Sequence, residues 1–291
     1  RHGANLRQRR RRRRKILRSI IFSCSIIAVA VFVAVGSSMI RSGDGRTNKY
    51  DVEAGNNTYD NAVIENSKIS EKNKIQNNQS MLDDIMNSTQ YPKQLKDLAL
   101  KNEEALEFVY DYPAEHVKEH TIDLTEEASM DSVPLFVQWD KRWGYEKYSG
   151  NFFAASGCGP TTLSMVVVYL THNREASPIA VAKYSKEAGY SVDGSGSSWT
   201  LISEGCMHYG VKAKAVALDE SRMKAELDAG HPIVINVGPG DFTDTGHFMV
   251  ITGYDDEGFS INDPNSIEKS GKRWLFKNIS SQIRAVWSMY V

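Results

Sequence analysis

The sequence predicts an α+β fold in which helices come first and an antiparallel sheet follows. Apolar residues recur at helical spacing in "CGPTTLSMVVVYLTH", "PIAVAKYSKEAG" and "SWTLISEGCMHYG". A strand, "KAKAVAL", and one further helix, "SRMKAELDAG", come next. The remainder alternates as strands do, in "HPIVINVG", "GHFMVITGYDDEGFSINDP" and "RAVWSMYV". No internal repeat is visible, and segregated helices and strands are typical of the α+β class.

The charge of the chain is distributed unevenly, although the 291 residues have a net charge of only −1. Residues 1–18 contain ten Lys and Arg residues, including the run Arg9 to Arg14, and the first acidic residue is Asp44. The other 25 basic residues face all 36 Asp and Glu, so residues 41–291 carry 25 − 36 = −11. We therefore divide the chain into a basic tail, residues 1–18, and an acidic body.

Between them, Ser19 to Ile40 is a stretch of 22 residues without a charge. As a helix it would be roughly 33 Å long, enough to cross the hydrocarbon core of a bilayer. The arginine run lies on its N-terminal side, so the positive-inside rule predicts a cytoplasmic N-terminus and an extracytoplasmic body. We expect a single-pass signal anchor at residues 19–40.

Two other interpretations of this region stay open. A cleavable signal peptide is one, because Ala34 and Gly36 are small residues at peptidase positions, but the apolar stretch exceeds the roughly 7 to 15 residues of a usual signal core. Nucleic-acid binding by the arginine run is the other. Because a membrane segment follows the run, we expect the membrane as a partner and no nucleic acid.

Residues 41–88 are rich in Asn, Ser, Lys and Gly, a composition that cannot bury enough apolar surface to offset ordering, so they are predicted to be a polar linker or stalk. Residues 89–132 form a predicted helical extension, because "YPKQLKDLALKNEEALEFVYDYP" has leucines at helical spacing over about four turns. We assign this helix to the start of the folded domain, with a separate interaction helix as the alternative. The main domain then covers residues 133–291 and begins with a short strand and an aromatic loop, "VPLFVQWDKRWGYEKY".

Cys158 is the candidate nucleophile. Cys24 lies in the apolar segment, which leaves Cys158 and Cys206 for the body, so one disulfide at most can form there, and no metal site of ordinary Cys/His spacing is present. Cys158 lies at the predicted start of a helix, where unpaired N–H groups and the helix dipole stabilise a thiolate. Gly157 and Gly159 permit close backbone approach, and Pro160 suits a first helical turn. The competing interpretation is a buried structural cysteine.

A cysteine nucleophile needs a base, and His247 is the candidate. It begins the alternating strand "GHFMVITGY", where a polar ring at the head of a core strand needs a hydrogen-bonding reason, and Gly246 opens space before it. The other histidines fall in polar, terminal or capping contexts: His2, His116, His120, His172, His208 and His231.

Asp263 ends the next strand and is the candidate for the acid that orients His247. A regular hairpin that paired Asp255 with Phe259 would place Asp263 opposite Ile251, roughly 13 Å from His247. A bulge or a different loop would have to shift this register. Asp255 is the fallback.

The stretches "VPLFVQWDKRWG", "ASGCGPTTLSMVVVYL" and "GHFMVITGYDDEGFSINDP" together resemble the papain-like cysteine peptidases related to bacteriocin leader-processing peptidases, in the stand-alone branch without a transporter. The resemblance covers residues 133–291 and implies a papain-like fold. It implies that Cys158 is the nucleophile, His247 the general base and Asp263 the group that orients it.

The same resemblance implies an oxyanion hole formed by the Cys158 backbone N–H and a side-chain amide, for which Gln138 is the matching position. In transporter-linked relatives the glutamine lies closer to the cysteine, where this chain has Phe152 and Ser156. "VDGSGSSWT" resembles a glycine-rich segment lining the substrate cleft, with Trp199 as a wall, and Gly157 and Gly246 are the other expected substrate-binding positions.

These features predict a membrane-anchored, extracytoplasmic cysteine peptidase that hydrolyses a peptide or amide bond through a thioester intermediate, without metal or cofactor. Its expected partner is a peptide or protein substrate. The alternatives are a cell-wall peptide hydrolase or a cysteine acyltransferase on the same scaffold, and a catalytically silent binding module.

Overall fold

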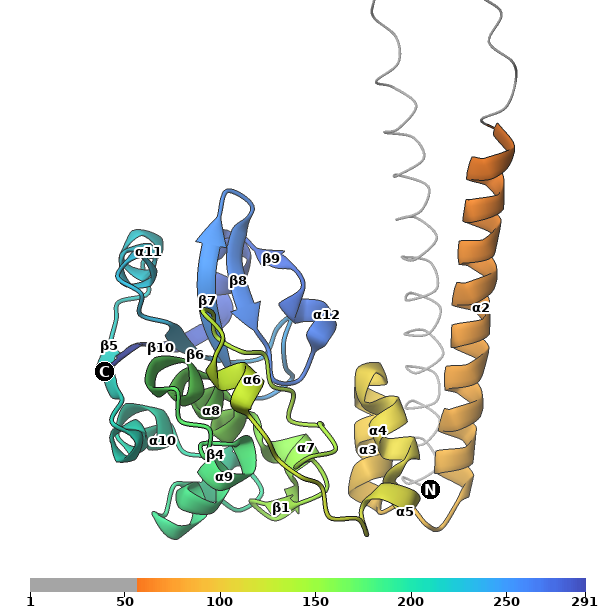
Figure 1. Cartoon of the computed structure of the whole chain (residues 1–291), viewed down its shortest axis with the longest axis horizontal. Coiled ribbons are helices and arrows are strands. Elements are labelled where there is room, and N and C mark those ends of the chain that lie inside the picture. The colour runs from red at the N-terminus through yellow and green to blue at the C-terminus, as the bar shows by residue number, and fades with distance from the viewer. Residues whose placement is uncertain (1–56) are drawn as a thin grey trace, which may run out of the picture. The chain divides into compact units, whose positions relative to one another are not determined.

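A six-stranded antiparallel sheet organises the C-terminal part of the chain (Figure 1). The computed structural model describes residues 57–291. Along the sheet the strand order is β5-β10-β6-β7-β8-β9, and each neighbouring pair is antiparallel. Its strands are β5 (Lys212–Ala215), β6 (Ile233–Val237), β7 (His247–Asp255), β8 (Gly258–Asn262), β9 (Arg273–Trp274) and β10 (Ile283–Tyr290). The α+β prediction is confirmed, and the predicted strands correspond to β5, β6, β7, β8 and β10.

Both faces of this sheet are buried at its centre, in the strand β6. All five of its residues are buried, because alternate side chains enter two different cores. Val234 packs in the core that contains helix α8 (Cys158–Thr171), whereas Ile233 and Ile235 pack in the core that contains Met223. Around β6 the sheet is therefore a layer between two cores.

The helices from Cys158 onward occur in the predicted order. Gly210 has φ 75°, which ends the predicted third helix; that helix is divided into a short α-helix and a 3-10 turn. The remaining helical elements of this region are α6 (Thr125–Ala128), α7 (Phe153–Ser156), α9 (Pro178–Glu187), α10 (Thr200–Ser203), η2 (Gly205–Tyr209), α11 (Glu220–Asp228), α12 (Ile267–Ser270), α13 (Phe276–Ile279) and η3 (Ser280–Gln282).

The short strand predicted at the start of the main domain is not formed. The carbonyls of Val133 and Pro134 accept hydrogen bonds from the Asn262 side chain instead, at 3.1 and 3.0 Å, so this segment runs beside β8 without joining its ladder. Two small hairpins lie farther along the chain: β1 (Lys147–Tyr148) with β2 (Asn151–Phe152), and β3 (Ser191–Val192) with β4 (Gly196–Ser197).

The helical extension packs on the main domain, but it is several pieces rather than one helix. They are α3 (Lys93–Lys101), η1 (Glu103–Ala105), α4 (Leu106–Tyr110) and α5 (Tyr112–Glu115). The break falls at Asn102, whose extended backbone ends α3 and whose side chain accepts a hydrogen bond from the Glu104 N–H. Leu95, Leu98 and Val109 share a core with Phe152 of the main domain, which supports the assignment of this segment to the folded domain.

Part of the predicted linker is helical. Helix α2 spans Asn57–Asn87, and its last turns pack through Ile85, which is fully buried in the core of the extension. Burial of Ile85 helps to offset the conformational entropy lost when this polar segment becomes ordered. Residues 41–56 lie outside the described residues.

The basic tail and the predicted membrane segment, residues 1–18 and 19–40, also lie outside the described residues. Within residues 57–291, none of the helices combines the length and apolar character needed to span a bilayer. Residues 64–291 form one compact unit, and the site described below lies entirely within it.

Glu226 on α11 ties this helix to the sheet and generates a test of the fold. Its carboxylate bonds to His231 at 3.0 Å, Ser288 at 2.7 Å and Lys214 at 3.1 Å. The hydrogen bond to His231, followed by that to Ser288, lowers the pKa of Glu226 to about 2. A carboxyl group with a depressed folded-state pKa stabilises the fold above its unfolded pKa, and this contribution is lost as the pH falls toward 2.

We expect Glu226→Gln to lower the free energy of unfolding by about 1–2 kcal/mol at pH 7, measured by urea denaturation. The difference from the wild type should shrink at pH 3, because the Glu226 carboxyl is then protonated in the unfolded chain but still mostly ionised in the folded one. Glu220→Gln, at the start of the same helix and bonded to Lys224, is the matched control and should have little effect. An equal loss at both pH values would contradict the role assigned to the carboxylate charge.

Candidate active site

Cys158 is the first residue of helix α8, as predicted, and its side chain is partly exposed. Gly157, the residue before it, has φ −85°, a backbone conformation that any residue can adopt. Glycine is required there for lack of space, because a Cβ would come within 2.6 Å of the Phe153 ring. A Cβ on Gly159 would likewise meet Ser197 at 2.6 Å. The two glycines therefore let the start of α8 pack closely against its neighbours, with the thiol at the helix N-terminus.

His247 is the first residue of β7 and is 6% exposed. Its position in the sheet is fixed by pairing with Val237 of β6. One ring nitrogen, Nε2, lies 2.6 Å from Oδ1 of Asp263. The Cys158 thiol is close enough for the thiol and the ring to shift each other's pKa, and Nδ1 is the ring nitrogen left to face it. The structure therefore brings Cys158, His247 and Asp263 together.

The register between β7 and β8 explains how Asp263 reaches His247. Asp255 pairs with Gly258 rather than with Phe259, so the turn has two residues, and a bulge between Ile251 and Gly253 adds a second shift. Val250 then lies opposite Asn262, which puts Asp263 opposite Met249. Asp263 is thus displaced from His247 by two residues along β7 instead of four. The two side chains are long enough to bridge the remaining distance.

Asp263 is completely buried. Its Oδ1 also accepts a hydrogen bond from the Asn265 N–H at 2.8 Å, whereas Oδ2 has no partner among the described residues. Asp255, the fallback, bonds to Arg273 at 2.5 Å on the exposed side of the hairpin. Asp263 is therefore the carboxylate that faces the imidazole.

The pKa values of Cys158 and His247 move in opposite directions. Burial pushes the pKa of the Cys158 thiol upward, but the hydrogen bond and charge of His247, with the N–H groups of Phe248 and Gly159, bring it below the usual value. Burial pushes the pKa of His247 downward, but the charge of Asp263 and the hydrogen bonds to Asp263 and Cys158 raise it to about 10. Between the two values the pair is a thiolate and an imidazolium, which titrate as a unit.

Gln138 lies beside this pair although it precedes Cys158 by 20 residues in the sequence. It is 4% exposed, its backbone N–H donates to the Pro264 carbonyl at 2.7 Å, and its Nε2 donates to the Ala154 carbonyl at 2.7 Å. An amide nitrogen has two N–H donors, so one of them remains available. Phe152 is buried and the Ser156 hydroxyl bonds to the Tyr148 and Phe152 carbonyls. Neither residue therefore offers a free side-chain N–H donor in place of Gln138.

A cleft of about 590 Å³ contains Gln138, Cys158, Gly246 and His247. The loop of residues 240–245 contributes to its lining. The extension supplies another part that the sequence did not indicate, through α3 and the following turn: Gln94, Asp97, Leu98, Lys101 and Asn102. These residues carry no motif, and only the packing of the extension brings them to the cysteine.

Two of the expected substrate-binding positions do not line this cleft. Trp199 precedes α10, its ring meets the Trp287 ring edge to face at 5.9 Å, and 45% of its surface is exposed. Gly157 is buried against Phe153, as described above. Gly246 does line the cleft, and a Cβ there would meet nothing closer than 3.9 Å.

No group of three or more His, Cys, Asp and Glu side chains is arranged to hold a metal ion within residues 57–291. The second cysteine of the body, Cys206, is fully buried, is not in a disulfide, and has its pKa raised to about 11 by burial.

These opposed pKa shifts predict selective alkylation of Cys158. With iodoacetamide near pH 7, the folded chain should react at Cys158 faster than a free thiol does, because a larger fraction is thiolate. Cys206 should react only after unfolding and serves as the internal control. His247→Ala should slow the reaction at pH 7 by roughly tenfold for each unit by which the thiol pKa comes to lie above 7. Equal rates with and without His247 would contradict the ion pair.

The main domain matches the model of the Peptidase_C39 like family over residues 130–291, more than half of the chain. Among solved structures, the peptidase domain of Streptococcus ComA, described as a bifunctional ABC transporter involved in quorum sensing, aligns with a TM-score of 0.40 and 18% identity, covering 54% of this chain and 96% of that one. A putative C39-like peptidase from Bacillus anthracis aligns with a TM-score of 0.35 and 17% identity, covering 55% and 95%. No curated protein sequence matches the chain. On the family match, the chain belongs to the Peptidase_C39 like family.

Proposed function

We propose that the protein is a cysteine peptidase that hydrolyses a peptide or amide bond with Cys158 as nucleophile. The observation that carries the proposal is the buried pair of His247 and Asp263, 2.6 Å apart, beside a thiol at a helix N-terminus. A cysteine, a base within hydrogen-bond reach and a third group that orients the base are the elements of nucleophilic catalysis. Membership of the Peptidase_C39 like family supports the same activity.

In the first half of the reaction, the Cys158 thiolate attacks the carbonyl carbon and the new C–S bond gives a tetrahedral oxyanion. The His247 imidazolium then donates its proton to the leaving amine as the C–N bond breaks, which leaves a thioester. In the second half, neutral His247 accepts a proton from water, and the hydroxide attacks the thioester. The C–S bond breaks, the acid product leaves, and the thiolate–imidazolium pair is restored.

The oxyanion would be held by the Cys158 backbone N–H and the free N–H of Gln138. The first N–H groups of a helix have no partner within it, so the N–H of Cys158 is available at the start of α8. Gln138 is held from two sides, at its backbone by Pro264 and at its amide by Ala154. Donors fixed before the reaction need no reorganisation when the negative charge develops.

Membrane anchoring and an extracytoplasmic position are part of the proposal and rest on the sequence of residues 1–40. The uncharged stretch 19–40 and the arginine run before it are the supporting observations. The substrate of the anchored enzyme would be a peptide or protein outside the cytoplasm.

The role of Gln138 is tested by Gln138→Ala. We expect kcat to fall by about 10²–10³-fold, the usual loss for one oxyanion donor, while the iodoacetamide rate of Cys158 stays at the wild-type level. Ser156→Ala, which removes a nearby hydroxyl bonded to the Tyr148 and Phe152 carbonyls, is the control and should keep its kcat. A Gln138→Ala enzyme with unchanged kcat would remove this residue from the mechanism.

The activity itself is tested by comparing the full chain with Cys158→Ala on an unstructured protein and on purified peptidoglycan. We expect new peptides from the unstructured protein, detected by mass spectrometry, and none with the variant. Release of peptides from peptidoglycan alone would favour a cell-wall hydrolase, and transfer of the acyl group to an added amine in place of water would favour an acyltransferase. Absence of any Cys158-dependent product, together with an unreactive thiol, would favour a catalytically silent binding module over an enzyme.

A further inference from the structure

The loop that carries Asp263 is held by the helical extension, from a point more than 160 residues earlier in the chain. Asp263 follows the end of β8 and forms an isolated β-bridge to Ser266 of the same loop. Residues 265–268 meet the turn between α3 and α4 through Asn102 and Glu104. These two residues lie outside the segment that matches the family model, residues 130–291.

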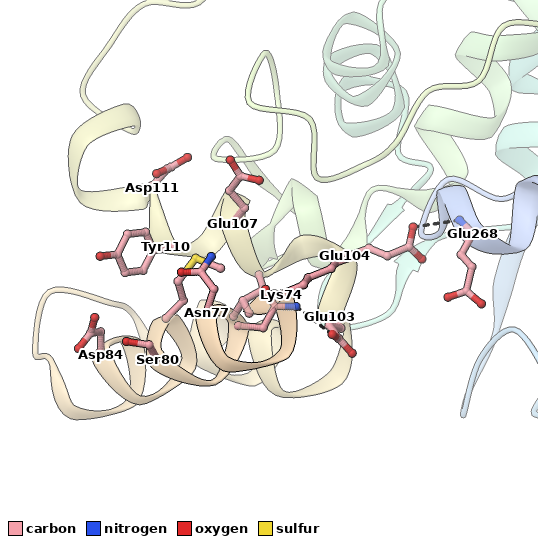
Figure 2. A pocket seen from close by; sticks show the side chains of 13 residues that line it. Lys74, Asn77, Ser80, Asp84, Glu103, Glu104, Glu107, Tyr110, Asp111 and Glu268 are labelled. Carbon is pink, nitrogen blue, oxygen red and sulfur yellow. Dashed lines mark hydrogen bonds between the residues drawn. The ribbon is translucent and has the colours of Figure 1, made fainter. Parts of the chain in front are cut away.

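Glu104 binds the start of α12 with both carboxylate oxygens. Oε1 accepts a hydrogen bond from the Ser266 hydroxyl, and Oε2 accepts from the N–H groups of Ile267 at 2.7 Å and Glu268 at 3.0 Å. Figure 2 shows Glu104 reaching to the Glu268 backbone nitrogen, at the edge of a hollow lined by α2, η1 and α4. A carboxylate with three donors is a strong attachment, because hydrogen bonds to a charged group are about twice as strong as neutral ones.

Asn102 connects the extension more directly to the catalytic acid. Its Nδ2 donates to the Asn265 carbonyl at 2.9 Å, and Trp139 Nε1 donates to the same carbonyl at 3.2 Å. The N–H of Asn265 donates to Asp263 Oδ1, the oxygen that His247 binds. One residue therefore separates the contact with the extension from the carboxylate of the triad.

Asp263 depends on this loop for its orientation. Oδ1 has two donors, His247 and the Asn265 N–H, and Oδ2 has no partner among the described residues. If Asn265 moves, the carboxylate retains only the bond to the imidazole that it is meant to orient. A shift of about 1 Å in a catalytic group is enough to reduce rates substantially.

We infer that Asn102 and Glu104 are positioning residues, which hold the loop of residues 263–268 so that Asp263 stays directed at His247. The inference rests on the proposed triad and extends it to the helical extension. The same extension lines the cleft next to Cys158 through Gln94, Asp97 and Lys101. The active site is therefore completed by a segment upstream of the family domain.

The test uses the full chain with Glu104→Ala and, as the matched control, Glu103→Ala. Glu103 is exposed and accepts a hydrogen bond from Asn78 of α2, and within residues 57–291 its side chain does not hydrogen bond to the loop of Asp263. The readout is the iodoacetamide rate of Cys158 as a function of pH, measured beside the melting temperature and, on a peptide substrate, kcat and KM.

We expect Glu104→Ala to move the acid limb of the profile about one pH unit higher, so that alkylation at a pH on that limb is roughly tenfold slower than in the wild type. The reason is that a displaced Asp263 stabilises the His247 imidazolium less. The thiol of Cys158 then has a higher pKa and a smaller thiolate fraction. On the peptide, kcat should fall more than KM changes. Glu103→Ala should match the wild type in both assays.

Glu104→Gln keeps the shape of the side chain and a neutral acceptor, so it should fold and give an intermediate alkylation rate, about two- to threefold below the wild type. It replaces Glu104→Ala if that variant is unfolded at the assay temperature. A folded Glu104 variant that reproduces the wild-type profile, even with a lower melting temperature, would overturn the inference and leave the proposed function intact. A wild-type Cys158 that reacts no faster than a free thiol would overturn both.

Discussion

The hydrogen bond between His247 Nε2 and Asp263 Oδ1 is the interaction on which the site depends. Both groups are almost completely buried, at 6% and 0% exposed, and an isolated charge in such a place would be very costly. As a pair, the two charges compensate for each other's loss of hydration. Removing one partner of a buried pair usually lowers the stability of a protein by about 3–5 kcal/mol. The pair also decides the state of Cys158, because the charge of Asp263 keeps the pKa of His247 high and the imidazolium keeps the thiol pKa low.

The sheet brings this pair together through two departures from a regular hairpin. The two-residue turn after Asp255 and the bulge after Ile251 each move β8 by one residue relative to β7. Gly258 makes the turn feasible, since its φ is 135° and a Cβ would come within 2.6 Å of the Trp274 backbone. Bulges are often found beside active sites because they redirect a side chain without breaking the sheet. Here the redirected residue is Asp263, the acid of the proposed triad.

The limits of prediction from the sequence follow from the range of the interactions involved. The helix at Cys158, the strand that starts with His247 and the α+β order could be predicted, because local periodicity, glycines and proline determine them. The register at Asp263 could not, since a bulge leaves no clear mark in a single sequence. The resemblance of "VDGSGSSWT" to a cleft-lining segment predicts Trp199 as a wall of the cleft, but its ring packs on Trp287, a partner 88 residues later in the chain. The split of the extension at Asn102 likewise depends on a distant partner, Asn265.

The distant contacts of the extension have a common physical consequence. A loop beyond the end of a strand has few ladder bonds, so its conformation must be fixed by side chains from elsewhere. For Asp263 those side chains are Asn102 and Glu104, on a segment whose helices are anchored by the burial of Leu95, Leu98 and Val109. Apolar packing far from the cysteine thus sets how firmly the carboxylate is directed, and the thiolate population depends on that direction. The boundary of the folded family domain and the boundary of the functional unit are therefore different, and the second includes the extension.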